Sequence, residues 1–218
     1  MQSNTVIFDM DGLLIDSEPL WQEAGQEVLS EYNIHLTDQQ YHSSTGLRTP
    51  EWIDYWFGVF TIDKTNAPNA INQIEDTALE KIKQGGVAMP GVEYILEFFR
   101  KRNFSIGLAS SSPLRLIEVV VDKLSIRKYL QVITSAESLA YGKPHPEVFI
   151  TCAKQLRVAP SQCIVFEDSF NGMIAAKAAK MKCVVIPHPS VYTLAHWSSA
   201  DLLLKSLEDF NEELIKEL

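Results

Sequence analysis

Two aspartates near the start of the chain, Asp9 and Asp11, have the type and spacing of groups that do chemistry. They follow a short apolar run at residues 5–8, and Gly12 comes directly after them. Two carboxylates at the end of a buried strand are costly to leave unpaired, so we expect a cation beside them. Mg²⁺ suits all-oxygen ligation and keeps positions open for water and phosphate. The alternative is that these residues only cap a turn or the next helix.

Four further residues that could take part in such chemistry, Ser110, Lys143, Glu167 and Asp168, lie later in the chain. A carboxylate can attack phosphorus and form an aspartyl phosphate, which divides one difficult step into two. Each pair of unit charges at ~4 Å opposes this approach by on the order of 4 kcal/mol at an effective dielectric near 20. Mg²⁺ and Lys143 together would offset that repulsion. Ser110 and the N–H groups of a helix start can hold phosphate oxygens.

Glu167 and Asp168 are expected to complete the oxygen shell of the metal or to orient its waters. Lys143 and Ser110 each also have a simpler interpretation. Lys143 alone could be a solvated loop lysine, and Ser110 alone could be a helix cap. The functional interpretation therefore depends on whether the fold brings the residues together.

Short apolar runs predict the strands that would position these residues. The predicted strands span residues 5–8, 105–109, 132–134, 163–166 and 183–187, with 201–204 as a possible edge strand. Helical patterns lie between them, which predicts an α/β fold with an open parallel, Rossmann-like sheet. Ligands bind at the carboxyl ends of the strands in such sheets, and the candidate residues all follow strands there.

Residues 17–86 contain helical patterns and no strand pattern. Helix starts are expected at Asp16-Ser17-Glu18-Pro19, at Thr37 and at Thr49-Pro50, and a further helix over residues 67–84. The predicted domains are therefore an α/β core, residues 1–16 and 87–218, and an inserted helical cap, residues 17–86. The aromatic stripe at residues 52–60 is expected to pack helices together, with a ligand platform as the alternative. A final amphipathic helix is expected after residue 204.

Composition limits the class of protein. The 218 residues are 46% apolar and 22% charged, which is typical of a soluble globular protein. A net charge of −9 argues against a broad basic surface for nucleic acid or an anionic membrane. The three cysteines lack metal-ligand spacing and are expected to be reduced core thiols. The first strand leaves no room for a signal peptide, and no apolar run approaches the ~20 residues of a membrane span, so we expect a cytoplasmic location. We expect a monomer, because no unusually long apolar face is left unassigned.

Four segments of the chain, residues 9–18, 109–113, 142–146 and 167–172, resemble in order the four motifs of the haloacid dehalogenase superfamily. The resemblance covers nearly the whole chain and includes the position of the helical cap. It implies that Asp9 is the nucleophile and that Asp11 is the general acid and later the base. It also implies that Mg²⁺ is held by Asp9, the backbone carbonyl of Asp11 and Asp168, with support from Glu167. By the same resemblance, Ser110 and Lys143 bind the phosphoryl group, and Ser111 and Asn171 belong to the substrate-binding residues.

The second aspartate of the first motif, Asp11, favours phosphoryl transfer, because founding dehalogenases lack it. β-Phosphoglucomutases share the cap and all four motifs and form the main alternative. Their first motif is usually followed by a histidine where this chain has Trp21, and their cap arginine lies one place later than Arg48. The motifs instead resemble hexitol phosphatases and 2-deoxyglucose-6-phosphate phosphatases.

The prediction is therefore a Mg²⁺-dependent phosphatase of small sugar or hexitol phosphates that works through a phospho-aspartate. The loop at Thr45-Gly46-Leu47-Arg48 is expected to face the substrate, with Gly46 in the binding site. Arg48 is expected to bind sugar hydroxyls or a carboxylate in the cap, and a solvated arginine at a helix start is the alternative. A non-enzymatic protein that binds phosphorylated metabolites is the hypothesis from another class. The intact set of Asp9, Asp11, Lys143 and Asp168 argues against it.

Overall fold

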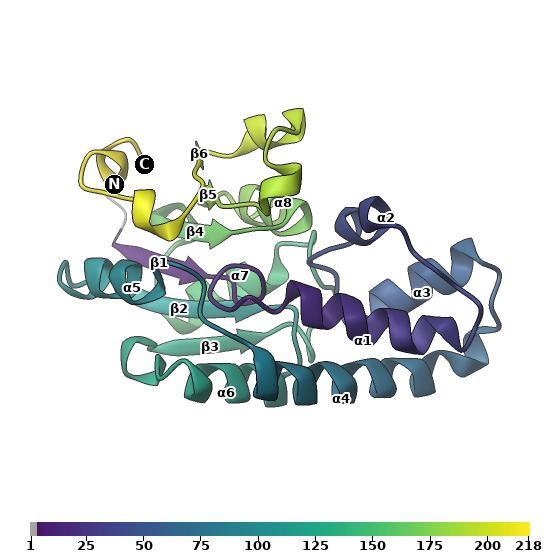
Figure 1. The fold of residues 1–218 in the computed structure, drawn as a ribbon. Coiled ribbons are helices and arrows are strands. Elements are labelled where there is room, and N and C mark those ends of the chain that lie inside the picture. Colours follow the sequence, from purple (N-terminus) through teal and green to yellow (C-terminus); the bar gives the residue numbers. More distant parts are fainter. Residues whose placement is uncertain (1–3) are drawn as a thin grey trace.

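The computed structural model describes residues 4–218 and contains a six-stranded sheet in the order β3-β2-β1-β4-β5-β6 (Figure 1). All neighbouring strands are parallel. The strands are β1 (Thr5–Phe8), β2 (Ser105–Ser110), β3 (Val132–Ser135), β4 (Cys163–Glu167), β5 (Lys182–Val185) and β6 (Leu202–Leu203). The core helices are α5 (Val92–Arg100), α6 (Leu114–Lys123), α7 (Glu147–Gln155) and α8 (Phe170–Ala178). This arrangement confirms the predicted α/β class.

Alternation along the central strand β1 explains why helices cover both faces of the sheet. Val6 and Phe8 pack into one hydrophobic cluster, while Ile7 between them packs into the other. Side chains of α5 and α6 fill the first cluster and side chains of α7 and α8 the second. A strand that is buried on both sides reads as a continuous apolar run, as residues 5–8 do.

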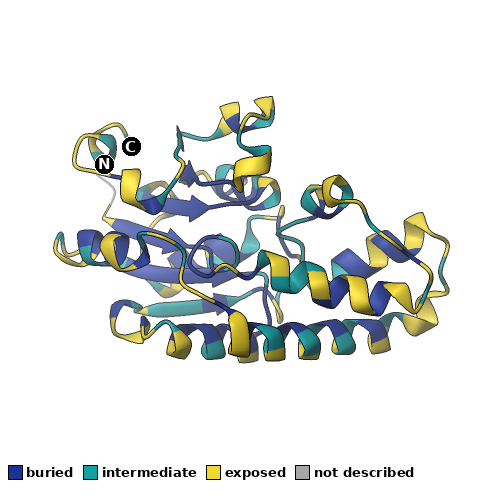
Figure 2. Ribbon diagram, in the orientation of Figure 1, coloured by how far each residue is buried: buried dark blue, intermediate teal, exposed yellow. Residues whose placement is uncertain are grey.

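Four helices, α1 (Glu18–Ser30), α2 (Asp38–Ser43), α3 (Thr49–Val59) and α4 (Ala67–Gly85), are inserted between β1 and β2. They lie beyond the carboxyl ends of the strands, at the right of Figure 1. α4 packs against α1 and α3 and also contacts α6 of the core. The cap helices expose their outer sides, and their buried residues face one another (Figure 2). The helical insertion is present where the sequence predicted a cap.

The two connections between the sheet and the insertion run side by side. Ile15 and Ala88 form an antiparallel bridge, and the N–H of Asp16 donates to the carbonyl of Val87 at 2.9 Å. Gly12 begins the first connection with a φ of +72°, a conformation that favours glycine. A Cβ at this position would also collide with the carboxylate of Asp168. The turn after the first motif therefore requires the glycine on both counts.

The C-terminal segment differs from its prediction. Residues 205–218 form two short 3-10 turns, Leu207–Asp209 and Leu214–Lys216, and the expected final helix is wrong. Side chains compete there with the helical backbone bonds, since Asn211 Oδ1 accepts from the N–H groups of Glu213 and Leu214. Burial of Phe210 among the phenylalanines of α5 and β4 then fixes the chain on the core.

Smaller expectations have mixed outcomes. All three cysteines are buried and free, as predicted. The aromatic stripe of α3 is largely buried, but Phe60 follows the helix and is exposed, and Trp52 also borders a cavity. Within residues 4–218, the helices are all too short or too polar to cross a membrane.

Candidate active site

The site is centred on a buried lysine between two carboxylates. Lys143 Nζ lies 2.6 Å from Asp9 Oδ1 and 2.5 Å from Glu167 Oε1. β1 positions Asp9, whose N–H donates to the carbonyl of Phe166 on β4 at 3.0 Å and so extends the sheet. Lys143 is 1% exposed and Glu167 is fully buried, so the three charges interact with little screening. The strand order thus brings together residues that are up to 158 positions apart in the chain, from Asp9 to Glu167.

The second oxygen of Glu167 is held just as firmly as the first. Glu167 Oε2 accepts the N–H groups of Asp168 and Ser169, both at 2.9 Å, and the hydroxyl of Ser169 at 3.0 Å. Ser169 also caps α8 by accepting the N–H of Gly172. A Cβ on Gly172 would collide with the Glu167 carboxyl group. Because both oxygens are occupied in this way, Glu167 orients Lys143 and the loop that follows β4.

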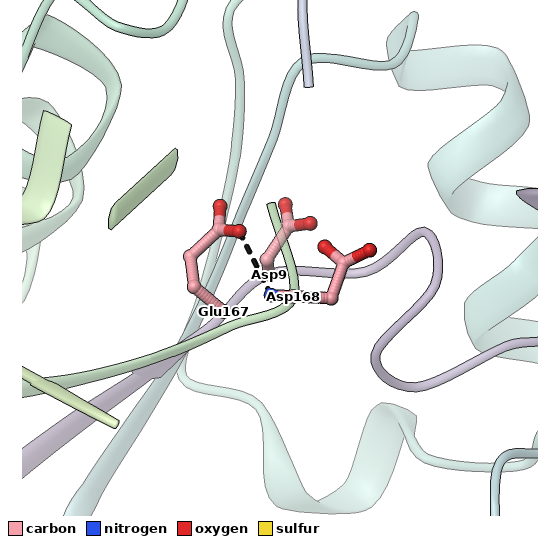
Figure 3. A group of neighbouring side chains, drawn as sticks. All are labelled: Asp9, Glu167 and Asp168. Atoms are coloured by element: carbon pink, nitrogen blue, oxygen red, sulfur yellow. Dashed lines mark hydrogen bonds between the residues drawn. The ribbon is translucent and has the colours of Figure 1, made fainter. Parts of the chain in front are cut away.

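Asp9, Glu167 and Asp168 form a compact acidic cluster in which one carboxylate oxygen from each residue lies within 4.8 Å of the other two (Figure 3). Burial raises the pKa of Asp9 to about 8, although the charge of Lys143 opposes the shift. The pKa of Asp168 is also raised well above its usual value, first by burial and then by the neighbouring carboxylates. Burial alone would lower the pKa of Lys143, but the charges of Asp9 and Glu167 raise it.

This cluster has more negative charge than Lys143 neutralises, and its donors are all carboxylate oxygens. A small divalent cation would relieve the repulsion between the carboxylates and would favour the ionised forms of Asp9 and Asp168, whose pKa values are raised without it. The residues present therefore fit a hard cation such as Mg²⁺.

The second aspartate of the first motif lies beside this cluster with each oxygen hydrogen-bonded. Asp11 Oδ1 accepts from Ser17 Oγ at 2.7 Å and from Trp21 Nε1 at 2.9 Å. Asp11 Oδ2 accepts from Ser112 Oγ at 2.7 Å and lies 3.4 Å from Ser110 Oγ. Donors from the cap and from the core thus meet on one carboxylate.

A cavity of about 80 Å³ lies between the cap and the carboxyl ends of the strands. Several of the predicted site residues line it, namely Asp9, Asp11, Gly46, Ser110, Ser111, Lys143 and Asp168. The cap contributes apolar and aromatic walls together with a few polar groups. The structure therefore brings most of the predicted residues to one enclosed space.

Arg48 and Asn171, which were predicted to bind substrate, do not line this cavity. Arg48 donates through Nη1 to the carbonyls of Ala136 and Leu139, at 3.0 and 2.8 Å, and pairs through Nη2 with Glu51 at 2.6 Å. Asn171 donates to the carbonyl of Thr45 at 2.8 Å.

These contacts hold the loop at residues 45–48 against the core, and Ser111 adds a bond to the carbonyl of Gly46 at 2.8 Å. The sugar-hydroxyl role expected of Arg48 does not match this geometry, whereas pairing with a cap carboxylate does. In this structure, Arg48, Asn171 and Ser111 join the cap to the core beside the cavity.

Three residues in the cavity have more prominent positions than the sequence indicated. Glu18 was expected only at a helix start, yet it faces the acidic cluster, and burial followed by the charges of Asp11 and Asp9 raises its pKa to about 8. Trp21, which stands where mutases usually have a histidine, donates a hydrogen bond to Asp11. Thr45 Oγ1 is buried and finds no hydrogen-bond partner among residues 4–218. A polar residue near the first motif was the available signal for Glu18, but docking of the loop that carries Thr45 is a long-range event.

Comparison with known proteins assigns a family to this arrangement. The family described as haloacid dehalogenase-like hydrolase matches residues 6–186. Hexitol phosphatase B of Escherichia coli is 36% identical over 204 residues, which are 93% of this chain and 92% of that protein. Fructose-1-phosphate phosphatase of the same organism is 30% identical over 82% of this chain and 94% of its own.

A solved structure of β-phosphoglucomutase from Clostridium difficile is 25% identical and covers all of this chain with a TM-score of 0.86. It covers 96% of its own chain. The predicted class of phosphoric monoester hydrolase agrees with the names of the sequence relatives. With four motifs in order, a buried acid cluster at the carboxyl ends of a parallel sheet and a family match over most of its length, the chain belongs to the haloacid dehalogenase-like hydrolases.

Proposed function

We propose that this protein is a Mg²⁺-dependent phosphatase of small phosphorylated sugars or polyols and that Asp9 becomes phosphorylated during each cycle. The observation that carries the proposal is the position of Asp9, paired with buried Lys143 and next to Asp11 and Asp168 in one cavity. A nucleophile, an acid–base group and a cation are thereby within reach of one substrate.

Each of these residues has a defined task in the proposed reaction. Asp9 attacks phosphorus, while Asp11 gives a proton to the oxygen of the departing alcohol. Asp11 then takes a proton from water, which attacks the phosphorus on Asp9 and releases inorganic phosphate. Lys143 and Ser110 hold phosphate oxygens throughout, and Glu167 keeps Lys143 oriented.

Asp9, Asp168 and the backbone carbonyl of Asp11 are the groups that would hold Mg²⁺. When bound, Mg²⁺ supplies positive charge that offsets the repulsion between the Asp9 carboxylate and the substrate phosphate.

The substrate class follows from the cavity and from the relatives. A sugar or polyol phosphate has to enter between the cap and the core, so we expect the cap to move as the substrate binds and as the products leave. Glu18 and the unpaired hydroxyl of Thr45 offer hydrogen bonds to substrate hydroxyls on the cap side. The hexitol and fructose phosphatases among the relatives support a sugar or polyol phosphate.

The test is release of inorganic phosphate from a panel of hexose 6-phosphates, 2-deoxyglucose 6-phosphate, hexitol phosphates and fructose 1-phosphate. We expect release with Mg²⁺ and none with excess chelator. A protein that is protected thermally by these compounds but releases no phosphate would be a binding protein, and the proposal would be wrong.

A phosphosugar mutase is the second candidate, because the fold matches a β-phosphoglucomutase over the whole chain. β-Glucose 1-phosphate separates the two activities. Conversion to glucose 6-phosphate without net phosphate release would favour the mutase, whereas net release of phosphate would favour the phosphatase.

A further inference from the structure

The two oxygens of Asp11 are held by groups of different chemical character. On Oδ1, the donors are the indole Nε1 of Trp21 at 2.9 Å and the hydroxyl of Ser17 at 2.7 Å. On Oδ2, they are the hydroxyls of Ser112 at 2.7 Å and Ser110 at 3.4 Å. Trp21 belongs to the first turn of α1 in the cap, and its side chain lines the cavity.

An indole N–H can donate a hydrogen bond but cannot accept one. The Trp21 N–H can therefore hold Oδ1 only as an acceptor. Serine hydroxyls can rotate and either donate or accept, so Ser17 on Oδ1 and Ser112 on Oδ2 adapt to either arrangement. Among the donors to Asp11 that the structure describes, Trp21 is thus the one that fixes the orientation of the carboxylate, and Oδ2 is the oxygen whose neighbours are both hydroxyls.

Oδ2 is also the oxygen on the side of Ser110, at the end of β2. Building on the proposed function, in which Ser110 holds the phosphoryl group, we propose that Trp21 is a positioning residue for the acid. Its N–H holds Oδ1 and so turns Oδ2 toward the oxygen of the departing alcohol.

The proton balance of the step is simple. Asp9 forms a bond to phosphorus as the bond from phosphorus to the alcohol oxygen breaks, and the proton on Asp11 Oδ2 moves to that oxygen. In the second step, Asp11 takes a proton from a water molecule. The oxygen of that water forms a bond to phosphorus as the Asp9–phosphorus bond breaks. The net reaction converts a phosphate monoester and water into an alcohol and inorganic phosphate.

The first step depends on the acid only when the leaving group is strongly basic. An alcohol requires the proton as it leaves, whereas acetyl phosphate releases a carboxylate whose conjugate acid resembles a glutamate side chain in strength, and this group departs without the proton. Loss of the Trp21 N–H is therefore expected to slow transfer from an alkyl phosphate and to spare transfer from acetyl phosphate. A general structural defect would slow both.

Trp21→Phe tests this by removing the N–H while keeping an aromatic ring. Rapid-quench measurement of the first phosphoryl transfer to Asp9 would use acetyl phosphate and either sorbitol 6-phosphate or glucose 6-phosphate, whichever the wild type transfers faster. General acids contribute about 10²–10⁴-fold, so we expect a loss of about tenfold or more with the sugar phosphate and less than about twofold with acetyl phosphate.

Trp56→Phe is the matched control, because this buried indole of the cap donates to Ser44 and not to Asp11. It should leave the ratio of the two rates unchanged. Trp21→His, which restores an N–H donor, should recover part of the lost rate. If Trp21→Phe fails to fold, replacement of Trp21 by 3-benzothienylalanine keeps the two-ring shape and removes only the N–H.

Equal slowing with both substrates, or no slowing with either, would overturn the positioning role of Trp21 and leave the phosphatase intact. A wild-type protein that transfers no phosphoryl group from any substrate would overturn the proposed function, and the role of Trp21 with it. The two failures are therefore distinguishable by the behaviour of the wild type.

Discussion

The two walls of the cavity differ in how completely their polar groups are paired. On the core wall, Asp9, Lys143 and Glu167 form a continuous set of hydrogen bonds that ends at Ser169, the residue that precedes the first turn of α8. On the cap wall, the hydroxyl of Thr45 is buried without a partner in the described residues, and Glu18 faces other acids. Groups that are paired, as Asp9, Lys143 and Glu167 are, are preorganised for one reaction, whereas unpaired groups can be satisfied by a substrate.

The strongest way to break this comparison is to remove the nucleophile from the paired wall. Asp9→Asn keeps the shape of the side chain and an oxygen that can accept from Lys143, but it cannot form the phospho-aspartate. We expect phosphate release to fall by about 10⁴-fold or more, while the melting temperature stays the same or rises, since a buried carboxylate is lost. Retained turnover in a correctly folded variant would contradict the assignment of Asp9.

Removal of the buried positive charge of Lys143 should affect both activity and stability. Lys143→Met leaves Asp9 and Glu167 without their partner, and breaking a buried ion pair from one side costs about 3–5 kcal/mol. Urea unfolding measures the loss. Lys64→Met is the control, because the pair of Lys64 with Asp54 is exposed and such pairs contribute about 1 kcal/mol or less. A similar, small loss in both variants would show that the core wall is not held by Lys143.

Divalent cations should stabilise the core wall in a pH-dependent way. The pKa of Asp9 is raised from 3.8 to about 8, so the folded protein binds more protons than the unfolded chain between these values. Without a cation, this contribution to stability is present below about pH 4 and is lost as pH rises through 8.

Mg²⁺ relieves that loss, so the increase in melting temperature that it causes should be larger at pH 8 than at pH 5. Scanning calorimetry with Mg²⁺ and with excess chelator would measure the difference. An equal increase at both pH values would contradict the link between the cation and the acidic cluster.

The smallest effect is expected from a substitution on the cap wall. It should stabilise the fold, whereas the loss of Lys143 should destabilise it. Thr45→Val replaces an unpaired buried hydroxyl with a methyl group of similar size, which should increase the free energy of unfolding by about 1 kcal/mol. The same change should raise KM for the sugar phosphate several-fold and leave kcat nearly constant. Thr45→Ser, which keeps the hydroxyl, should leave KM close to that of the wild type. A loss of stability in Thr45→Val would mean that the hydroxyl is already satisfied.

Sequence was informative about the core wall because each of its residues follows a strand. Local apolar patterns located the strands, and a parallel sheet necessarily gathers their carboxyl ends, so Asp9, Lys143 and Asp168 could be placed together. The final helix was predicted wrongly for a related reason. Local periodicity indicated a helix after residue 204. The burial of Phe210 among distant phenylalanines and the turn at Asn211 instead decide the conformation.

The cap wall was harder to predict because its contacts join segments that are remote in the chain. Arg48 binds the carbonyls of residues 136 and 139, and Asn171 binds the carbonyl of Thr45. No pattern within a window of residues reports such contacts. Their partners are backbone carbonyls, which any loop of suitable shape could provide.

The side-by-side course of the two connections has a consequence for how such proteins diversify. Since Asp16 and Val87 are hydrogen-bonded neighbours, the insertion leaves and rejoins the core at nearly one point. An element attached in this way is a module: its length and sequence can change without altering the distance that the core has to span. Exchange of residues 17–86 for the corresponding segment of a relative should therefore transplant substrate preference together with the donors to Asp11 Oδ1, while Asp9, Lys143 and Glu167 stay in place.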